Sequence, residues 1–180
     1  MNTKRNTLHI ASITKIALCV AILCASSYLV IPLPFTPIVL TVHTILINLI
    51  GLIFKPKEAA YTILTYILMG LIGLPVFAGG TTGPGKLFGP TGGFYFGFLF
   101  AAIAISLLKG KENNFPRYIL ITLVVGIPIQ HIFAILFMCF YNNFHIQSAL
   151  LTVSLPFLPG DILKAVIASA LARTLNKQSR

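Results

Sequence analysis

Long apolar runs alternate along the chain with short segments rich in proline, glycine or charge. A helix needs about 17 to 25 mostly apolar residues to cross a bilayer. Runs close to this length lie at 13–31, 38–54, 58–74, 91–108, 118–141 and 160–175. The last run is the shortest and carries Asp161 and Lys164. Hydropathy alone therefore predicts five or six transmembrane helices.

Two other architectures do not fit this pattern. A transmembrane barrel would alternate apolar and polar residues in segments of about ten, whereas the apolar runs here are unbroken. A soluble domain carries about a quarter charged residues, but 9% of this chain is charged and 57% is hydrophobic. Since we detect no internal repeat, we expect one transmembrane domain over residues 1–180.

The positive charges orient the predicted helices. The chain has 13 Lys and Arg against 3 Asp and Glu, a net charge of +10. With six spans, the N-terminus, turn 55–57, connection 109–117 and the C-terminal tail share one side, and they hold every cation except Lys86 and Lys164. Short cytoplasmic loops retain Lys and Arg. We therefore predict an all-α integral membrane protein, a bundle of six transmembrane helices with both termini cytoplasmic. Because the positive charge is explained by this orientation, it does not indicate nucleic-acid binding.

The connections on the opposite, outer side are rich in proline and glycine, and they cover 31–37, 74–93 and 155–161. A single Gly or Pro is usually a turn residue. The dense glycines of the longest connection, Gly79 and Gly92 among them, would let the backbone approach a ligand or fold over it. Their concentration on one side favours a binding site there.

Asp161 and Lys164 are the charged pair on this outer side. They lie three residues apart, so both side chains project from one face of the last predicted helix. Because Pro159 and Gly160 lead into the helix, Asp161 is expected at or near its N-cap. A cap with a lysine partner is one interpretation. Ionisable residues at membrane depth are costly and usually functional, which favours the other, a ligand role.

Other polar residues lie within the second and fifth runs. Thr41, Thr44 and Asn48 have helical spacing and should face the bundle or a cavity. Thr44 and Asn48 are expected to make interhelical hydrogen bonds, whereas Thr41 and His43 lie nearer the outer end and could reach a ligand. In the fifth run, Gln130 and His131 follow Pro128, which is expected to kink the helix. Structural polar contacts are expected for both.

Motifs for catalysis, metal binding or nucleotide binding are not found in the sequence. The 4 histidines lack the spacing of a metal site, and acidic ligands are scarce. The glycine-rich segment ends in Lys86-Leu87 and does not match a phosphate loop, which needs Ser or Thr after the lysine. We therefore expect no enzymatic activity and no cofactor, and an energising partner is implied.

The first predicted helix carries a ridge of small residues. Ala17, Ala21 and Ala25 recur every four residues, a spacing that allows close approach of another helix. The ridge either packs inside this bundle or docks a partner.

Taken in order, four blocks of the sequence resemble the BioY family, the biotin-binding substrate-specificity subunits of energy-coupling factor transporters. These blocks are Ile31–Pro37, Tyr66–Gly80, Gly89–Phe98 and Pro156–Lys164. They contain Gly-Leu-Pro-Val-Phe, Gly-Pro-Thr-Gly-Gly and Pro-Gly-Asp-x-x-Lys in this order. With six spans and this length, the resemblance covers essentially the whole chain.

The resemblance implies a multi-pass subunit of the plasma (inner) membrane that captures biotin from outside. It would deliver biotin together with a transmembrane coupling subunit and two ATPase subunits. In that family the alanine ridge of the first helix contacts the coupling subunit, here Ala17, Ala21 and Ala25. The chain itself would hydrolyse nothing.

The functional groups of biotin suit the polar residues found. We expect Asp161 to accept a hydrogen bond from a ureido N–H, and Lys164 or Lys86 to bind the carboxylate or the ureido oxygen. Phe77, Phe88 and Tyr95 are expected to pack the apolar body, under a closing loop. The predicted ligand-binding residues are Asp161, Lys164, Lys86, Thr41, His43, Phe77, Gly79, Gly92 and Tyr95.

The chain departs from the family pattern at two positions, with His43 where Gln is usual and Val39 where a second Pro is usual. His43 can donate and accept hydrogen bonds as Gln does, and its titration would make uptake depend on pH. Two alternatives stay open. The chain could be a specificity subunit for another small vitamin, or a structural or assembly membrane protein without a ligand.

Overall fold

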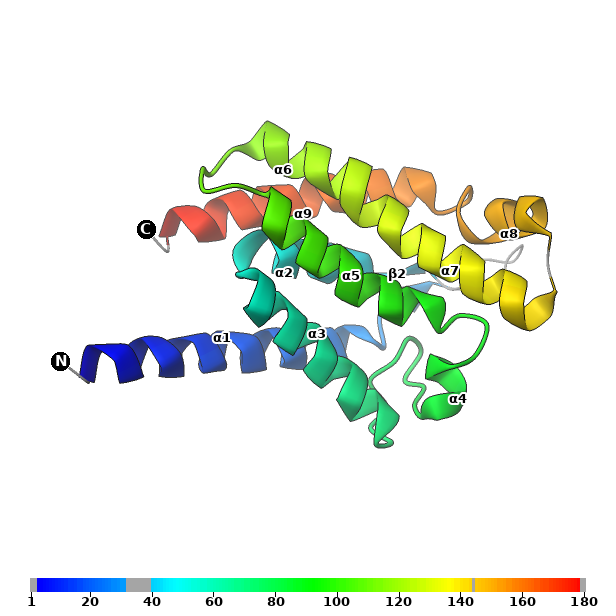
Figure 1. Cartoon of the computed structure of the whole chain (residues 1–180), viewed down its shortest axis with the longest axis horizontal. Coiled ribbons are helices and arrows are strands. Elements are labelled where there is room, and N and C mark those ends of the chain that lie inside the picture. Colours follow the sequence, from blue (N-terminus) through cyan, green and yellow to red (C-terminus); the bar gives the residue numbers. More distant parts are fainter. Residues whose placement is uncertain (1–2, 32–39, 144, 179–180) are drawn as a thin grey trace.

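The computed structural model describes residues 3–31, 40–143 and 145–178 (Figure 1). Most of the predicted outer connection 31–37, and Val39, lie outside the described residues. The elements are α1 (Thr3–Ser26), β1 (Val30–Ile31), β2 (Leu40–Thr41), α2 (His43–Ile53), α3 (Pro56–Leu71), α4 (Pro84–Leu87), α5 (Gly93–Leu108), α6 (Phe115–Ile121), the π-helix η1 (Thr122–Gly126), α7 (Ile127–Asn142), α8 (Ile146–Val153) and α9 (Leu158–Gln178).

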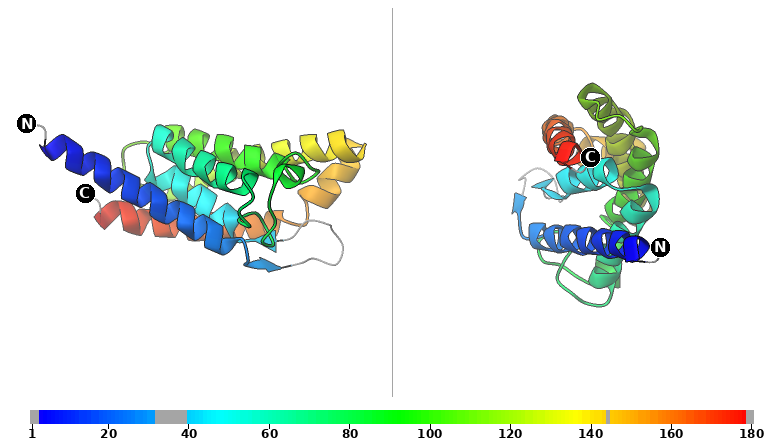
Figure 2. Two further views of the ribbon diagram at one scale, coloured as in Figure 1. Left: turned by 90° about the horizontal axis from the view of Figure 1, so that it is seen from below. Right: turned by 90° about the vertical axis from the view of Figure 1, so that its left-hand side faces the viewer.

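The long helices run along one direction and form an elongated bundle (Figures 1 and 2). The first turn of α1 and the last turn of α9 lie at the same end, which we call the terminal end (Figure 2). The short helices α4 and α8 lie at the opposite end, which we call the loop end (Figure 1). This arrangement matches the helical bundle that the apolar runs predict.

Within the described residues, one helix is long and apolar enough to cross a membrane alone, the continuous stretch Phe115–Tyr141 formed by α6, η1 and α7. The pair α8 and α9, bent by 53° between them, passes the same test together. Ile10–Ser26, His43–Ile53 and Gly93–Leu108 are shorter apolar helices. The six-span topology therefore stays a prediction.

The second predicted span is shortened by a strand pair. α2 begins at His43, and Thr41 lies in β2, which pairs antiparallel with β1 (Val30 with Thr41, Ile31 with Leu40). The prediction that Thr41 shares a helix with Thr44 is therefore wrong. Val30, Ile31 and Thr41 are β-branched and favour extended backbone, and the pairing satisfies backbone groups on both strands.

The last helix begins earlier than predicted, at Leu158. Pro159 and Gly160 lie in its first turn, where a missing proline N–H removes no helical hydrogen bond. The Asp161 N–H donates to the Phe157 carbonyl at 2.8 Å, so Asp161 lies inside the helix. Asp161 is therefore near the N-terminus of the helix, in its first turn, but it is not the N-cap residue.

The helix of the fifth predicted span accommodates Pro128 by forming a π-helix just before it. Within η1 the Ile127 N–H donates to the Thr122 carbonyl, five residues earlier. Pro128 follows at once and cannot donate a helical hydrogen bond. Widening the preceding turn is a common way to accommodate such a gap. Residues Phe115–Tyr141 therefore form one continuous helix with a wide turn before the proline, and the kink stays a prediction.

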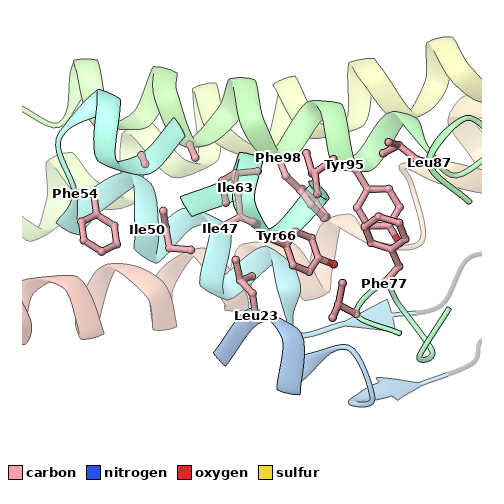
Figure 3. Packing of buried hydrophobic residues seen from close by; sticks show 14 residues of the cluster. Leu23, Ile47, Ile50, Phe54, Ile63, Tyr66, Phe77, Leu87, Tyr95 and Phe98 are labelled. Carbon is pink, nitrogen blue, oxygen red and sulfur yellow. The ribbon is translucent and has the colours of Figure 1, made fainter. Parts of the chain in front are cut away.

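The main hydrophobic core lies between α1, α2, α3 and α5 (Figure 3). Leu23, Ile47, Ile63 and Tyr66 are fully buried there. The outward faces carry large apolar side chains that remain exposed, for example Phe140 at 79%. Polar side chains would cover these faces in a soluble protein, so the pattern fits a bundle surrounded by lipid.

We expect Gly70→Ala to destabilise the bundle by about 1–3 kcal/mol. A Cβ at Gly70 would overlap three atoms of the Phe77 ring, which is fully buried beside α3. The thermal unfolding midpoint in detergent measures the effect. Gly85→Ala is the matched control, because a Cβ there meets nothing within 4 Å. Equal midpoints for the two variants would contradict the tight packing of Gly70 on Phe77.

Candidate ligand-binding site

A cavity of about 320 Å³ lies among α2, α5, α7, α9 and the connection between α3 and α5. This volume is within the range of small-molecule sites, about 300–1,000 Å³. The described residues that line it are Thr41, His43, Thr44, Ala78, Gly79, Thr81, Lys86, Thr91, Phe94, Tyr95, Phe98, His131, Phe157, Asp161 and Lys164. Its wall therefore combines aromatic rings with charged and hydroxyl groups.

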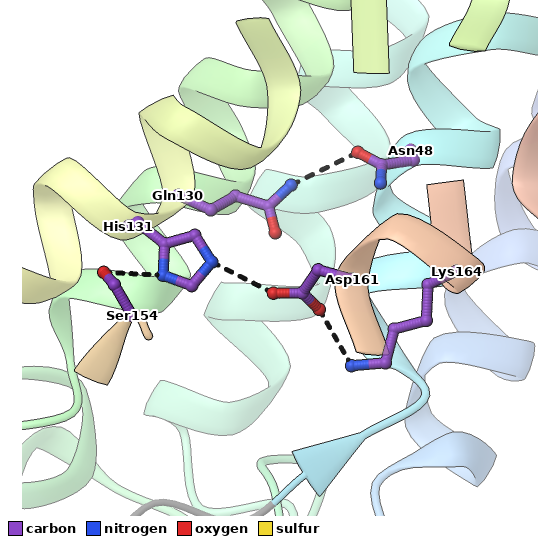
Figure 4. A network of polar contacts seen from close by, with 6 residues as sticks. All are labelled: Asn48, Gln130, His131, Ser154, Asp161 and Lys164. Carbon is purple, nitrogen blue, oxygen red and sulfur yellow. Dashed lines mark hydrogen bonds and ion pairs between the residues drawn. The ribbon is translucent and has the colours of Figure 1, made fainter. Parts of the chain in front are cut away.

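The charged part of the wall is a buried cluster around Asp161 (Figure 4). Asp161 Oδ1 accepts from Lys164 Nζ at 3.0 Å, and Asp161 Oδ2 lies 3.0 Å from His131 Nε2. These three residues come from α7 and α9 and are no more than 8% exposed. Buried charges are tolerated only when they are paired, so each carboxylate oxygen holds one partner.

The hydrogen bonds of His131 follow from its neighbours. A carboxylate accepts only, so Nε2 carries the hydrogen toward Asp161, and Nδ1 accepts from Ser154 Oγ at 3.1 Å. Ser154 lies in the turn after α8 (Figure 4). The bend between α8 and α9 thus orients the imidazole that holds Asp161.

Aromatic side chains of α5 form the apolar part of the wall. Phe94, Tyr95 and Phe98 share one side of the helix because helical neighbours recur at three and four residues. The ring of Tyr95 contacts that of Phe98 edge to face at 5.9 Å. The Tyr95 hydroxyl accepts a hydrogen bond from the Ala78 N–H at 3.2 Å. The helix thereby holds the loop that passes over the cavity.

That loop is fastened to two helix ends. Its Gly79 N–H donates to the Ser27 carbonyl after α1 at 2.8 Å, and its Gly83 N–H donates to the Gly70 carbonyl of α3 at 2.9 Å. Gly79 has φ +75°, a region that favours glycine. The loop therefore has a fixed path over the cavity.

Lys86, on α4, faces the cavity from this loop. Partial burial lowers the pKa of its ammonium group. Within the described part of the chain, Lys86 forms no ion pair. An anionic group of a ligand would supply the missing counter-charge.

The sequence profile of the BioY family matches residues 1–180. The chain belongs to the BioY family. It is 35% identical over 175 residues to Biotin transporter BioY2 of Lactococcus lactis subsp. cremoris, covering 94% of each protein. It is 34% identical over 147 residues to Biotin transporter BioY of Thermotoga maritima, covering 82% of this chain and 86% of that protein.

A solved structure has the same fold as this BioY chain. It is the crystal structure of the S-component for biotin from an ECF-type ABC transporter. The two superpose with a TM-score of 0.87 at 27% sequence identity, covering 96% of this chain and 94% of the other. The mostly helical fold is therefore that of an S-component.

Most of the predicted ligand-binding residues meet at the cavity of this BioY chain. Those that line it are Asp161, Lys164, Lys86, Thr41, His43, Gly79 and Tyr95. They come from four helices, β2 and the loop. Three of the four blocks that carry the family resemblance, Tyr66–Gly80, Gly89–Phe98 and Pro156–Lys164, thus contribute residues to one site.

Three residues expected at the site lie elsewhere. Phe77 is fully buried behind Tyr95, with ring centroids 4.4 Å apart, and supports the wall from the core. Gly92 precedes α5, where a side chain would overlap the Leu87 carbonyl. Phe88 is 50% exposed and its ring contacts Phe96. None of these three lines the cavity.

Sequence reasoning missed several wall residues, of which His131 is the most important. We expected it to make only structural contacts, yet it lines the cavity and binds Asp161. No sequence spacing links residues on two helices 30 positions apart. Phe94 and Phe98 could have been found, because they lie in the resembling block and Phe98 follows Phe94 and Tyr95 by four and three residues, a helical spacing. The expectation for Gln130 is confirmed, since its Nε2 donates to Asn48 Oδ1 at 3.3 Å.

The alanine ridge lies on the outside of α1. Ala17, Ala21 and Ala25 are exposed, while Val20 and Leu23 face the core. Of the two interpretations of the ridge, packing inside this bundle is wrong. Docking of a partner stays a prediction.

Proposed function

We propose that this chain is the biotin-binding, substrate-specificity subunit (S component) of an energy-coupling factor transporter. The observation that carries the proposal is the family match over residues 1–180, together with a cavity to which three of the four resembling blocks contribute residues. The named relatives and the solved S-component concern biotin. The chain would bind and hand over its ligand without transforming it.

The chemistry of the wall supports biotin as the ligand. Asp161 presents an acceptor for a ureido N–H, and the rings of Phe94, Tyr95 and Phe98 offer an apolar surface to the thiophane ring. Lys86 has no acidic partner within the described residues, and it suits the valerate carboxylate. The ureido end of biotin would then face the Asp161 carboxylate, and the valerate end would face the Lys86 ammonium group.

Isothermal titration of the detergent-purified protein with biotin tests the proposal. We expect saturable one-to-one binding of biotin and no binding of riboflavin or thiamine. Binding of another vitamin in place of biotin would support the alternative of a different S component. A protein that binds none of them would contradict a role as an S component.

We expect Lys86→Met to lower biotin affinity about tenfold, because it removes a charge-assisted hydrogen bond to the carboxylate. The affinity for biotinol, in which a hydroxymethyl group replaces the carboxylate, should change much less. Titration with both ligands measures the difference. Lys57→Met, which removes an exposed charge at the start of α3, is the matched control. Equal losses for both ligands would contradict this role of Lys86.

The membrane arrangement that we propose is a six-span bundle in the plasma membrane with both termini cytoplasmic. Its support is the shared position of the two chain ends at the terminal end and the concentration of cations in the segments assigned to that side (Figure 2). The exposed apolar faces would contact lipid. The loop end, with the cavity, would face outside.

Partner subunits are the last part of the proposal. The sequence has no phosphate-loop motif, so energy for uptake must come from elsewhere. A transmembrane coupling subunit with two ATPase subunits would supply it. The exposed ridge of Ala17, Ala21 and Ala25 is the surface that we assign to the coupling subunit.

A further inference from the structure

His43 has one ring nitrogen without a partner. It is the first residue of α2, is 1% exposed and lines the cavity. Its Nε2 lies 3.0 Å from the Tyr66 hydroxyl. Its Nδ1 is buried and has no hydrogen-bond partner among the described residues. A buried polar atom of this kind calls for a partner that enters the cavity.

The bond to Tyr66 decides which nitrogen carries the hydrogen. Tyr66 is fully buried, and among the described residues its hydroxyl forms a hydrogen bond with His43 Nε2. If Nε2 carried the hydrogen, the Tyr66 O–H would be left without an acceptor, which is costly for a buried donor. Tyr66 therefore donates to Nε2, and a neutral imidazole then carries its hydrogen on Nδ1.

The packing fixes the direction of this donor. The His43 ring lies parallel to that of Phe98, with centroids 6.3 Å apart and an interplanar angle of 5°. Tyr66 is held in turn by the Phe77 ring, edge to face at 5.8 Å. The rings of Phe98, Tyr66 and Phe77 belong to the main hydrophobic core (Figure 3). The Nδ1–H is thus oriented before any ligand arrives.

We propose that His43 donates its Nδ1–H to an oxygen acceptor of the bound ligand, and that Tyr66 is a positioning residue that sets the tautomer. The inference rests on the proposed function, because biotin supplies the oxygen. Biotin carries two such acceptors, the ureido oxygen and the carboxylate. His43 would then select for ligands with an oxygen acceptor at this point of the cavity.

Titration of three ligands against wild type, His43→Leu and His43→Gln tests the proposal. The ligands are biotin, 2-thiobiotin, in which sulfur replaces the ureido oxygen, and biotinol. We expect His43→Leu to lower biotin affinity about tenfold. His43→Gln should stay within about threefold of wild type, because its amide can donate in place of Nδ1–H.

The ratios of affinities identify the acceptor. If it is the ureido oxygen, the preference for biotin over 2-thiobiotin shrinks in His43→Leu. If it is the carboxylate, the preference over biotinol shrinks instead. Either result supports the proposal, and unchanged ratios for both analogues would overturn it. A wild-type protein that binds none of these ligands would overturn the proposed function as well, whereas wild-type binding with unchanged ratios would overturn only the role of His43.

Tyr66→Phe tests the positioning role with a change that keeps the ring. We expect about a threefold loss of biotin affinity, and no further loss when Tyr66→Phe is added to His43→Leu, because the two residues act as one unit. Tyr61→Phe on the same helix, at a side chain that is 59% exposed, is the matched control. Additive losses in the double variant would overturn the role of Tyr66.

Discussion

Replacing Asp161 by asparagine is expected to lower biotin affinity by about 100-fold or more. The substitution keeps the shape of the side chain and removes its charge. It leaves the buried Lys164 ammonium without its 3.0 Å partner. It also places an amide N–H₂ where a carboxylate oxygen faces a donor from His131 or Lys164. Isothermal titration measures the loss.

Two controls separate this loss from general damage. Glu112→Gln makes the same change at an exposed carboxylate in the connection between α5 and α6, and it should bind biotin as wild type does. Combining Asp161→Asn with Lys164→Met removes the unpaired charge and should recover thermal stability without recovering affinity. Wild-type affinity in Asp161→Asn would contradict the assignment of Asp161 as a ligand residue.

Ala21→Trp is expected to lower biotin uptake by cells more than about tenfold while the purified subunit binds biotin within about twofold of wild type. Small residues allow close approach of helices, and a large ring at the centre of the exposed ridge would hold a partner helix away. Uptake of radiolabelled biotin and titration of the isolated subunit measure the two effects. Co-purification of the partner subunits should fall with uptake.

Ile132→Trp provides the comparison for this variant. It places the same ring at an exposed apolar position of α7, away from α1, where the side chain is 53% exposed. Uptake by this variant should be near that of wild type. Unimpaired uptake by Ala21→Trp would show that the ridge does not dock the partner.

The sequence predicts the helices of the bundle well, because a helix with one side in the core and the other side in lipid is apolar along its whole length. It predicts their ends less well. Thr41 belongs to a strand because its backbone pairs with Val30. Val30 lies earlier in the chain, on the far side of the connection between the two strands. Pro128 lies inside a continuous helix because a π-turn forms before it. Both outcomes depend on neighbours that hydropathy does not record.

The candidate site shows the same division. Asp161 and Lys164 can be found because a charged pair in an apolar helix is unusual and its spacing is local. The partner His131 comes from another helix, and only the bend between α8 and α9 brings Ser154 to its other nitrogen. Phe77 was expected at the ligand and lies in the core, since its side chain turns to Gly70 and Tyr66. Residue type predicted an aromatic wall without saying which rings face inward.

The hydrogen bond from the Gly79 N–H to the Ser27 carbonyl joins the loop over the cavity to the segment that ends α1. The same helix carries the exposed alanines. A displacement of α1 by a docked subunit would therefore be felt at the loop, and a ligand that fixes the loop would fix the end of α1. Such linkage is reciprocal. If a bound ligand makes docking of the partner subunit more favourable, docking makes ligand binding more favourable by the same free energy.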